Sequence, residues 1–184
     1  MRVYRSRLPD VDIPEEDIFH FLFERPDRRC NEHVEVLIDA HSTRRMTGGQ
    51  LREASLRFAG GLQQRLGAQN GQVLAIFAHN SINYSTVLFG SLAAGLTVTV
   101  ANPAYHVHEL VYQLRGSGAQ FIVASFDVLS VARKAAVEAG ILATRIVVLD
   151  AHRQSNLEPM SVDEHITHIY VILPALPVDQ KALS

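Results

Sequence analysis

The sequence of 184 residues lacks the features that define several large classes of protein. It has a single cysteine, Cys30, which excludes an internal disulfide and fits a reducing compartment. No apolar run approaches the length that a membrane-spanning helix needs. Basic and acidic side chains nearly balance, with a formal net charge of −2, and no basic run is long enough to follow a phosphate backbone. We therefore expect no disulfide framework, no membrane span and no nucleic-acid partner.

The two ends of the sequence carry no recognisable targeting signal. Residues 1–7 are charged and lack the apolar core of a secretory signal peptide, and acidic residues within 10–17 follow too soon for a mitochondrial presequence. The final Ala182-Leu183-Ser184 does not match the Ser-Lys-Leu type of peroxisomal address. We therefore expect an intracellular location, cytoplasmic by default.

The main positive feature is a regular alternation of apolar runs and helix-length segments. The apolar runs begin near residues 72, 97, 120 and 145, and one helix-length segment separates each from the next. The pattern predicts strands at 73–78, 97–101, 121–124 and 146–149, with helices at 82–94, 107–115 and 126–139. Because parallel strands need crossover helices, this order predicts an α/β fold with a wound, mostly parallel sheet flanked by helices. At this length the core needs no metal or disulfide.

The segment before the alternating part has shorter elements. Pro14 suits the first turn of a short helix. The apolar face of this helix is predicted to consist of Ile18, Phe21 and Leu22. Two short strands are expected next, at 34–39 and 44–47, joined by a polar turn.

A long amphipathic helix is predicted after these strands. Thr47 and Gln50 form the capping-box pattern at its start, and Gly67 provides a left-handed end. Its inner face is predicted to consist of Leu51, Ala54, Phe58, Leu62 and Leu66. The Gly60-Gly61 pair costs this helix about 1 kcal/mol per glycine relative to alanine, which close packing against the sheet would explain.

His106, His108 and Glu109 are the clearest candidates for metal ligands. They stand together at the start of a predicted helix, but the four ligands of a structural metal site are not completed nearby. We interpret them as solvated surface groups. His165 and His168 carry less weight, because they lie in an atypical C-terminal tail.

Three other patterns that are typical of active sites have simpler explanations. Residues 116–118 (Gly-Ser-Gly) resemble part of a dinucleotide-binding fingerprint, but a strand follows them instead of a helix, so we predict a plain turn. Cys30 lies in a charged loop with no evident histidine base, which favours a free structural thiol. Ser81 and Ser125 follow strands without the glycine-flanked elbow of a nucleophile, so we interpret them as helix caps.

The carboxyl ends of the predicted strands provide one candidate binding position. The first two strands of the alternating part end at His79-Asn80 and at Asn102-Pro103. Ligands of open α/β sheets bind outside the carboxyl ends of the strands. If the chain is a complete small binding protein, we expect these residues to form its site.

Residues 102–110 carry a more specific pattern, Asn-Pro-Ala-Tyr-His-Val-His-Glu-Leu, with Gln113-Leu114 and Ser117-Gly118-Ala119 after it. This stretch resembles the adenylate-forming acyl-CoA synthetases, particularly the 4-coumarate–CoA ligase-like group. Other segments look like the same family in the same order, at 8–14, 46–51, 73–81, 95–103 and 161–164. The resemblance covers roughly residues 5–165 and implies the first subdomain of that family's large N-terminal domain.

The resemblance implies a reaction in which a carboxylate attacks the α-phosphate of ATP and a thiol, that of CoA, then takes the acyl group. Such chemistry needs a Ser/Thr/Gly loop and lysines around the phosphates, together with Mg²⁺. In the family these groups lie beyond the segment that resembles this chain, and the sequence contains no such loop. We therefore assign no catalytic, cofactor-binding or metal-binding residue, and expect ATP, Mg²⁺ and CoA only for the full-length family.

The chain also departs from the family pattern at three places. His106 replaces the usual threonine of a helix cap, which we expect to weaken the cap by about 1 kcal/mol. His79 stands where the family usually has a proline, and Gly48-Gly49 replaces larger residues.

The final segment, 165–184, does not continue the alternation. We interpret residues 1–164 as a partial AMP-binding subdomain, and 165–184 as an edge strand or as a foreign tail left by truncation or a misread exon boundary. The expected function is that of a ligase fragment that is inactive alone. A small binding protein or an interaction module without catalysis remains the alternative, and a fragment is expected to expose an apolar face where the rest of the enzyme would pack.

Overall fold

A computed structural model describes residues 7–25, 31–40 and 43–149 of the chain. Within these ranges the helices are α1 (Ile18–Phe23), α2 (Gly48–Leu66), α3 (Ile82–Ala93), α4 (Val107–Ser117) and α5 (Leu129–Ala139). The strands are β1 (Glu35–Ile38), β2 (Arg45–Thr47), β3 (Val73–Phe77), β4 (Thr97–Ala101), β5 (Phe121–Ser125) and β6 (Ile146–Leu149). Two short 3₁₀ helices, η1 (Phe126–Val128) and η2 (Ala143–Arg145), flank α5.

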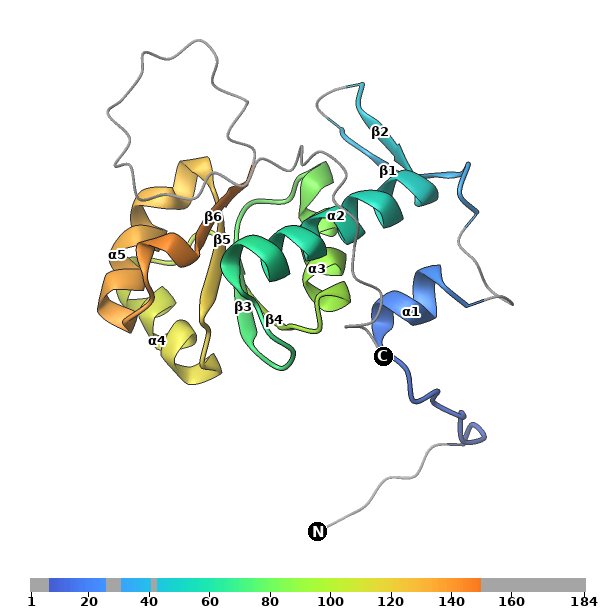
Figure 1. Ribbon diagram of the computed structural model, residues 1–184, viewed down its shortest axis with the longest axis horizontal. Helices are drawn as coiled ribbons and strands as arrows, with labels where there is room; N and C mark the ends of the chain where they lie inside the picture. The colour runs from blue at the N-terminus through green and yellow to red at the C-terminus, as the bar shows by residue number, and fades with distance from the viewer. Residues whose placement is uncertain (1–6, 26–30, 41–42, 150–184) are drawn as a thin grey trace.

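Strands β3 to β6 form a four-stranded parallel sheet in the order β4-β3-β5-β6. Helices α3, α4 and α5 provide the crossovers, and Figure 1 shows α4 and α5 on one side of the sheet with α2 and α3 on the other. The predicted wound parallel sheet flanked by helices is confirmed, and each predicted strand of this sheet agrees with the structure to within one residue at either end.

The core is divided by the sheet into two layers. Leu74 and Ile76 face the layer of α2 and α3, whereas Ala75 and Phe77 face the layer of α4 and α5. This alternation follows from the two-residue period of a strand. Because both faces are covered, all four of these side chains are fully buried, and the strand reads as a continuous apolar run.

Strands β1 and β2 form a separate antiparallel ribbon. Leu37 and Met46, which pair across the ribbon, pack against the core layer of α2 and α3. Val36 is an extra residue between the paired positions 35 and 37, where the register shifts. The ribbon stands beside the start of α2, apart from the main sheet (Figure 1).

Helix α2 begins and ends as the sequence predicts. The Thr47 hydroxyl accepts a hydrogen bond from the Gln50 N–H at 3.3 Å, and the Gln50 side chain accepts one from the Thr47 N–H at 2.9 Å. Gly67 follows the helix in the left-handed conformation, with φ of 63°. Gly60 and Gly61 are buried within the helix, and their close packing against the sheet stays a prediction.

The apolar face predicted for the first helix is wrong. The helix begins at Ile18, because the Asp17 side chain caps it by accepting the His20 N–H at 2.8 Å, and Pro14 lies ahead of it. The buried residues are Phe19 and Phe23, whereas Ile18 is 56% exposed. Phe23 turns inward because its ring contacts Phe19 and the α3 side chain of Phe89.

The predicted helix at 126–139 is also corrected. Its first turn is the 3₁₀ helix η1, in which the Leu129 N–H bonds the Phe126 carbonyl three residues back. The α-helix begins only at Leu129. This tighter turn holds Asp127 close to the carboxyl end of β5.

Several expectations fall on residues outside the described ranges. These are Cys30, His165 and His168, together with the tail at 165–184. The domain boundary at residue 164 likewise stays a prediction. Among the described residues no helix is both long and apolar enough to cross a membrane.

Candidate functional site at the carboxyl ends of the strands

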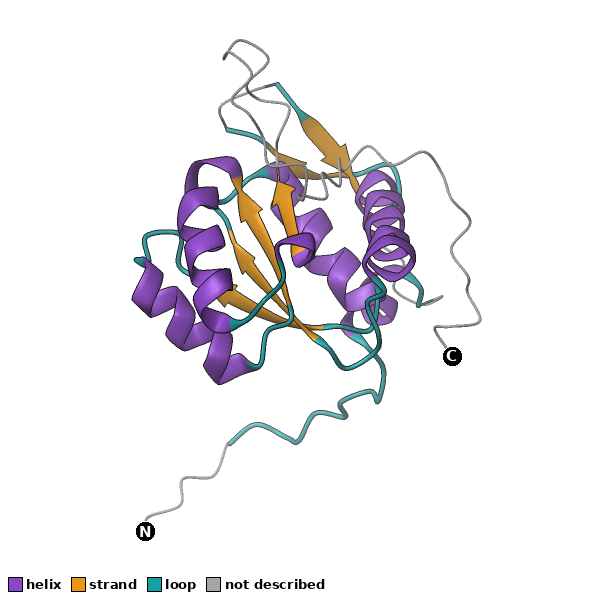
Figure 2. Cartoon of the chain, turned by 60° about the vertical axis from the view of Figure 1, so that its left-hand side comes forward, coloured by secondary structure: helices purple, strands orange, loops and turns teal. Residues whose placement is uncertain are grey.

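The four parallel strands place their carboxyl ends at one edge of the sheet, and Figure 2 shows their arrowheads at the same end. From the end of β3 the chain passes to α3, on the face covered by α2 and α3. From the end of the neighbouring strand β5 it passes to α5, on the opposite face. The direction of winding therefore reverses between β3 and β5. At such a reversal the loops after the two neighbouring strands lead to opposite faces of the sheet. Ligands of open α/β sheets bind in the space between these loops.

His79 and Asp127 meet across this reversal point. The His79 Nε2 lies 3.0 Å from the Asp127 Oδ2, and the His79 backbone N–H donates to the Ser125 Oγ at 3.4 Å. His79 and Asp127 side chains are 61% and 56% exposed, so water screens their attraction. The loops after β3 and β5 are thus joined by a solvated polar cluster, which we call the switch cluster (His79, Ser125 and Asp127).

The switch cluster contains serine, histidine and aspartate but does not activate the serine. The contact to Ser125 comes from the main-chain N–H of His79, while the imidazole Nε2 faces Asp127. A nucleophilic serine needs an imidazole nitrogen within hydrogen-bond distance of its hydroxyl. The observed contacts position the two loops, and they match no acyl-transfer triad.

Ser81 and Ser125 both stand at helix N-cap positions, as predicted, but neither side chain makes a capping hydrogen bond. Ser81 occupies the cap position of α3, but its side chain makes no capping bond, and the Tyr84 N–H bonds the Ser81 carbonyl instead. The Ser81 Oγ is buried without a hydrogen-bond partner. Ser125 precedes η1 without capping it, and its hydroxyl instead accepts the N–H of His79.

At the end of β4, Asn102 forms a turn. Its Oδ1 accepts the Ala104 N–H at 3.0 Å and its carbonyl accepts the Tyr105 N–H at 2.9 Å. Such side-chain bonds to the backbone two residues on are the usual role of asparagine in turns. Asn102 therefore lies at the same sheet edge as His79, as expected, with its side-chain oxygen already bonded.

Of the three candidate metal ligands near α4, His106 and His108 are exposed, in agreement with their interpretation as surface groups, and Glu109 has a structural role. The Glu109 Oε2 accepts the His106 N–H at 2.8 Å, which satisfies a donor at the helix start. The rings of His106 and His108 stack with centroids 6.3 Å apart and an interplanar angle of 11°. Within the described ranges no group of three or more histidine, cysteine, aspartate or glutamate side chains is arranged to hold a metal.

The Gly-Ser-Gly run at 116–118 is a plain helix end, as predicted. The Ser117 hydroxyl donates to the Gln113 carbonyl at 2.8 Å. Gly118 follows in the left-handed conformation with φ of 68°, and β5 begins soon after. This turn offers a phosphate no set of outward-facing N–H groups at a following helix, which the fingerprint requires.

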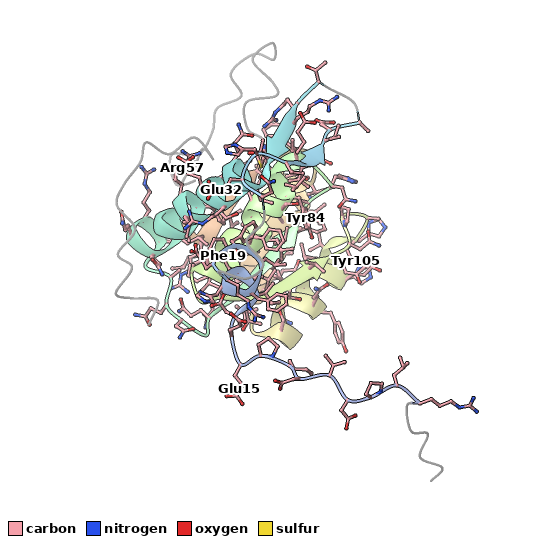
Figure 3. The ribbon with its side chains drawn as sticks, turned by 90° about the vertical axis from the view of Figure 1, so that its right-hand side faces the viewer. Glu15, Phe19, Glu32, Arg57, Tyr84 and Tyr105 are labelled. Atoms are coloured by element: carbon pink, nitrogen blue, oxygen red, sulfur yellow. The ribbon has the colours of Figure 1, made fainter. Side chains whose placement is uncertain are left out.

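Sequence reasoning did not single out Asp127 or Tyr84. Asp127 comes two residues after Ser125, but its meeting with His79 depends on the strand order, which no local pattern reveals. Tyr84 lies on α3 with the β1–β2 ribbon above it in Figure 3. It packs against the core, and its burial raises the pKa of the phenol above the usual value.

Comparison with known proteins gives a consistent result. A family model described as "AMP-binding enzyme" matches residues 22–180. A 4-coumarate–CoA ligase of Pinus taeda is 36% identical over 126 residues, which are 66% of this chain and 22% of that protein. A long-chain-fatty-acid–CoA ligase of Salmonella typhimurium is 34% identical over 125 residues, which are again 66% of this chain and 22% of that protein. The chain therefore spans less than a quarter of the length of these curated relatives.

Solved structures of larger enzymes share the fold. A benzoate CoA ligase from Burkholderia xenovorans matches with a TM-score of 0.58 and 25% identity, over 64% of this chain and 23% of that one. A luciferase-like enzyme from the mealworm Zophobas morio matches with a TM-score of 0.73 and 20% identity, over 96% of this chain and 39% of that one. Because the luciferase-like enzyme is only 20% identical to this chain, its match shows a shared fold alone.

Proposed function

Because this chain belongs to the AMP-binding enzyme family, with residues 22–180 matching its model, we propose that it provides the first wound subdomain of an acyl-CoA ligase. In this role it forms a packed scaffold and does not make an acyl-adenylate by itself. The full reaction joins a carboxylic acid to CoA at the expense of ATP. Relatives named for 4-coumarate and long-chain fatty acids indicate an organic acid as the substrate class.

The proposal rests on the small fraction of its relatives' length that this chain covers. Its matched segment corresponds to 22% of the length of the curated ligases. A ligase must hold ATP, an acid and a thiol in one site and must neutralise the charge that develops on the phosphates. We infer that most groups for these tasks belong to the remaining length of such an enzyme.

The chemistry of the carboxyl edge agrees with a scaffold role. At the reversal point between β3 and β5 stands the Asp127 carboxylate, which repels phosphate oxygens. Its partner His79 is a single side chain, whereas several lysines and a metal ion usually neutralise the charge of transferring phosphates. The sequence has only two lysines, Lys134 on α5 and Lys181.

The test is acid-dependent exchange of pyrophosphate into ATP by the purified chain. It is offered 4-coumarate, benzoate or a long-chain fatty acid with Mg²⁺, and the Pinus taeda ligase serves as the active control. We expect exchange at the background rate of the protein-free reaction with every acid. Acid-dependent exchange that rises with the concentration of the chain would overturn the proposal.

Binding without catalysis is the second candidate function, and the switch cluster favours it. Ser125 is only 8% exposed and accepts the His79 N–H, and the His79 side chain contacts Asp127, at the edge where open α/β sheets take ligands. The exposed imidazole and carboxylate of this cluster can bond a small polar ligand from both sides of the reversal point.

The second candidate is tested by NMR titration of the chain with AMP and with CoA. A binding protein gives saturable shifts confined to residues 79–81 and 125–127, and Asp127→Asn changes the affinity. Glu53→Gln is the matched control, since Glu53 is an exposed carboxylate paired with Arg57 on α2. Unsaturable or scattered shifts reject binding at this edge and leave the scaffold role.

A further inference from the structure

The free edge of β4 is the least protected part of the main sheet among the described residues. The strand pairs with β3 in five consecutive positions from Val73–Thr97 to Phe77–Ala101, with no bulge. It stands at the end of the strand order, so its other side has no strand partner in the described sheet. The five residues Thr-Val-Thr-Val-Ala contain neither a charge nor a proline. Bulges, lysines and prolines are the usual devices that keep such an edge from pairing.

The backbone of β4 presents alternate residues to the two sides. The Thr97 N–H donates to the Gln72 carbonyl, so Thr97 points toward β3. Because successive residues point to opposite sides, Thr99 also faces β3, while Val98 and Val100 face the free edge. The Val100 carbonyl confirms this direction, since it accepts a hydrogen bond from the Gln113 side chain of α4 at 2.9 Å.

The side chains at this edge are apolar and partly uncovered. Val100 is 57% exposed although it lies in a strand of the main sheet. Val98, on the same face of the strand as Val100, packs against the core layer of α2 and α3. An added strand would therefore cover Val100 and extend this layer.

We propose that two copies of this chain associate by antiparallel pairing of their β4 strands. The two-fold axis passes beside Thr99, so that Val98 of each copy faces Val100 of the other. Each Val98–Val100 pair exchanges both of its N–H···O bonds, because these are the two residues that point outward. The result is one continuous sheet that runs from β6 of one copy through both β4 strands to β6 of the other.

The sequence of β4 suits pairing with a second copy of the same strand. Valines at 98 and 100 are placed symmetrically about Thr99, so the strand is complementary to itself when reversed. Antiparallel pairing of identical strands gives a closed two-fold interface, the commonest kind in homo-oligomers. No charged residue lies within β4, so the two strands meet without repulsion between like charges. The Val100 carbonyl has a second lone pair, and its bond from Gln113 is retained.

The first experiment measures the mass of the full chain by sedimentation equilibrium over a range of concentrations. We expect a monomer–dimer equilibrium, and we expect Val100→Lys to weaken the dimer by about tenfold. Val100 is exposed, so the lysine is compatible with the fold. Val137→Lys is the matched control, because Val137 is 79% exposed on α5, and it leaves the equilibrium unchanged.

Residue-resolved amide exchange tests the pairing without a mutation. Thr97 and Thr99 point toward β3, and we expect their N–H groups to be protected at every protein concentration. Protection of the Val98 and Val100 N–H groups is expected to rise with concentration in step with the dimer. A chain that stays monomeric at all concentrations, or a dimer that Val100→Lys does not weaken, would overturn the proposal. These readouts do not depend on nucleotide or acid, so they are independent of the proposed ligase role.

Discussion

Gly90 of α3 lies so close to Ser55 of α2 that the two helices are in backbone contact. A Cβ atom on Gly90 would stand 2.6 Å from the Ser55 carbonyl oxygen and 2.9 Å from the Phe58 ring. Phe58 is 2% exposed and belongs to the core layer of these helices. The absence of a side chain at position 90 therefore sets the distance between α2 and α3, and with it the packing of this face of the sheet.

Gly90→Ala is expected to destabilise the chain. The neighbour at 2.6 Å is a backbone carbonyl, which cannot move without shifting α2, and overpacking of a core typically costs about 1–3 kcal/mol. Urea denaturation measures the free energy of unfolding. The control is Gly116→Ala on α4, where a Cβ would meet nothing within 4 Å and alanine raises helix propensity. Equal stability of the two variants would contradict the close contact.

Phe23→Ala is expected to cost about 3–5 kcal/mol, the usual range for removing a buried phenylalanine. Phe23 is 7% exposed, and its ring lies 4.9 Å from Phe19 and 5.3 Å from Phe89. The control is Ile18→Ala on the same helix, which is 56% exposed and should cost much less. Thermal unfolding of both variants checks the assignment of the buried face. A larger loss for Ile18→Ala would restore the face predicted from the sequence.

Thr47→Ala is expected to lower the free energy of unfolding by about 1 kcal/mol, because its hydroxyl accepts the Gln50 N–H. Ser81→Ala is the matched substitution at the start of α3. Its hydroxyl makes no capping bond and is buried without a partner, so its loss should be close to neutral. Denaturation curves of the two variants compare them directly. A larger loss of unfolding free energy in Ser81→Ala than in Thr47→Ala would contradict the structure at these two caps.

The buried phenol of Tyr84 is expected to make the free energy of unfolding fall as the pH rises into the alkaline range. Burial raises the pKa of its phenol, so the unfolded chain loses this proton at a lower pH than the folded chain does. Between the unfolded value of about 10 and the raised folded value, the folded state binds more protons, and stability therefore falls as pH rises. Tyr84→Phe should make the fall less steep. The measurement is the free energy of unfolding on either side of about pH 10, and an unchanged slope in the variant would contradict it.

Features that depend on neighbouring residues were predicted correctly from the sequence, whereas a feature that depends on residues far apart in the chain was not. Thr47, Gln50 and Gly67 were predictable because a cap depends on residues within one helical turn of each other. The strands of the main sheet were predictable because burial on both faces leaves a continuous apolar run. The buried face of α1 was not, because Phe23 contacts Phe89, which lies in a different helix.

The candidate site was only half predictable for the same reason. His79 was named because it follows a strand, and all strands of a parallel sheet end at one edge. Its partner Asp127 was missed, because β3 and β5 are neighbours only in the strand order β4-β3-β5-β6. Ser125 stands at the predicted cap position, but its hydroxyl bonds the loop after β3 instead of capping the helix, which the sequence did not reveal.

The sequence alone determined the wound α/β alternation and the approximate boundaries of its strands, because hydrophobic period and local turn chemistry act over a few residues. The motif at residues 102–110 suggested the ligase-like family by resemblance, and the match of residues 22–180 to the family model confirmed it. Only the tertiary structure decided that β3 lies beside β5, that His79 meets Asp127, that Gly90 touches α2 and that β4 is left at an edge. These relationships join residues far apart in the chain. They are fixed by how the helices and the sheet pack, which no local pattern in the sequence encodes.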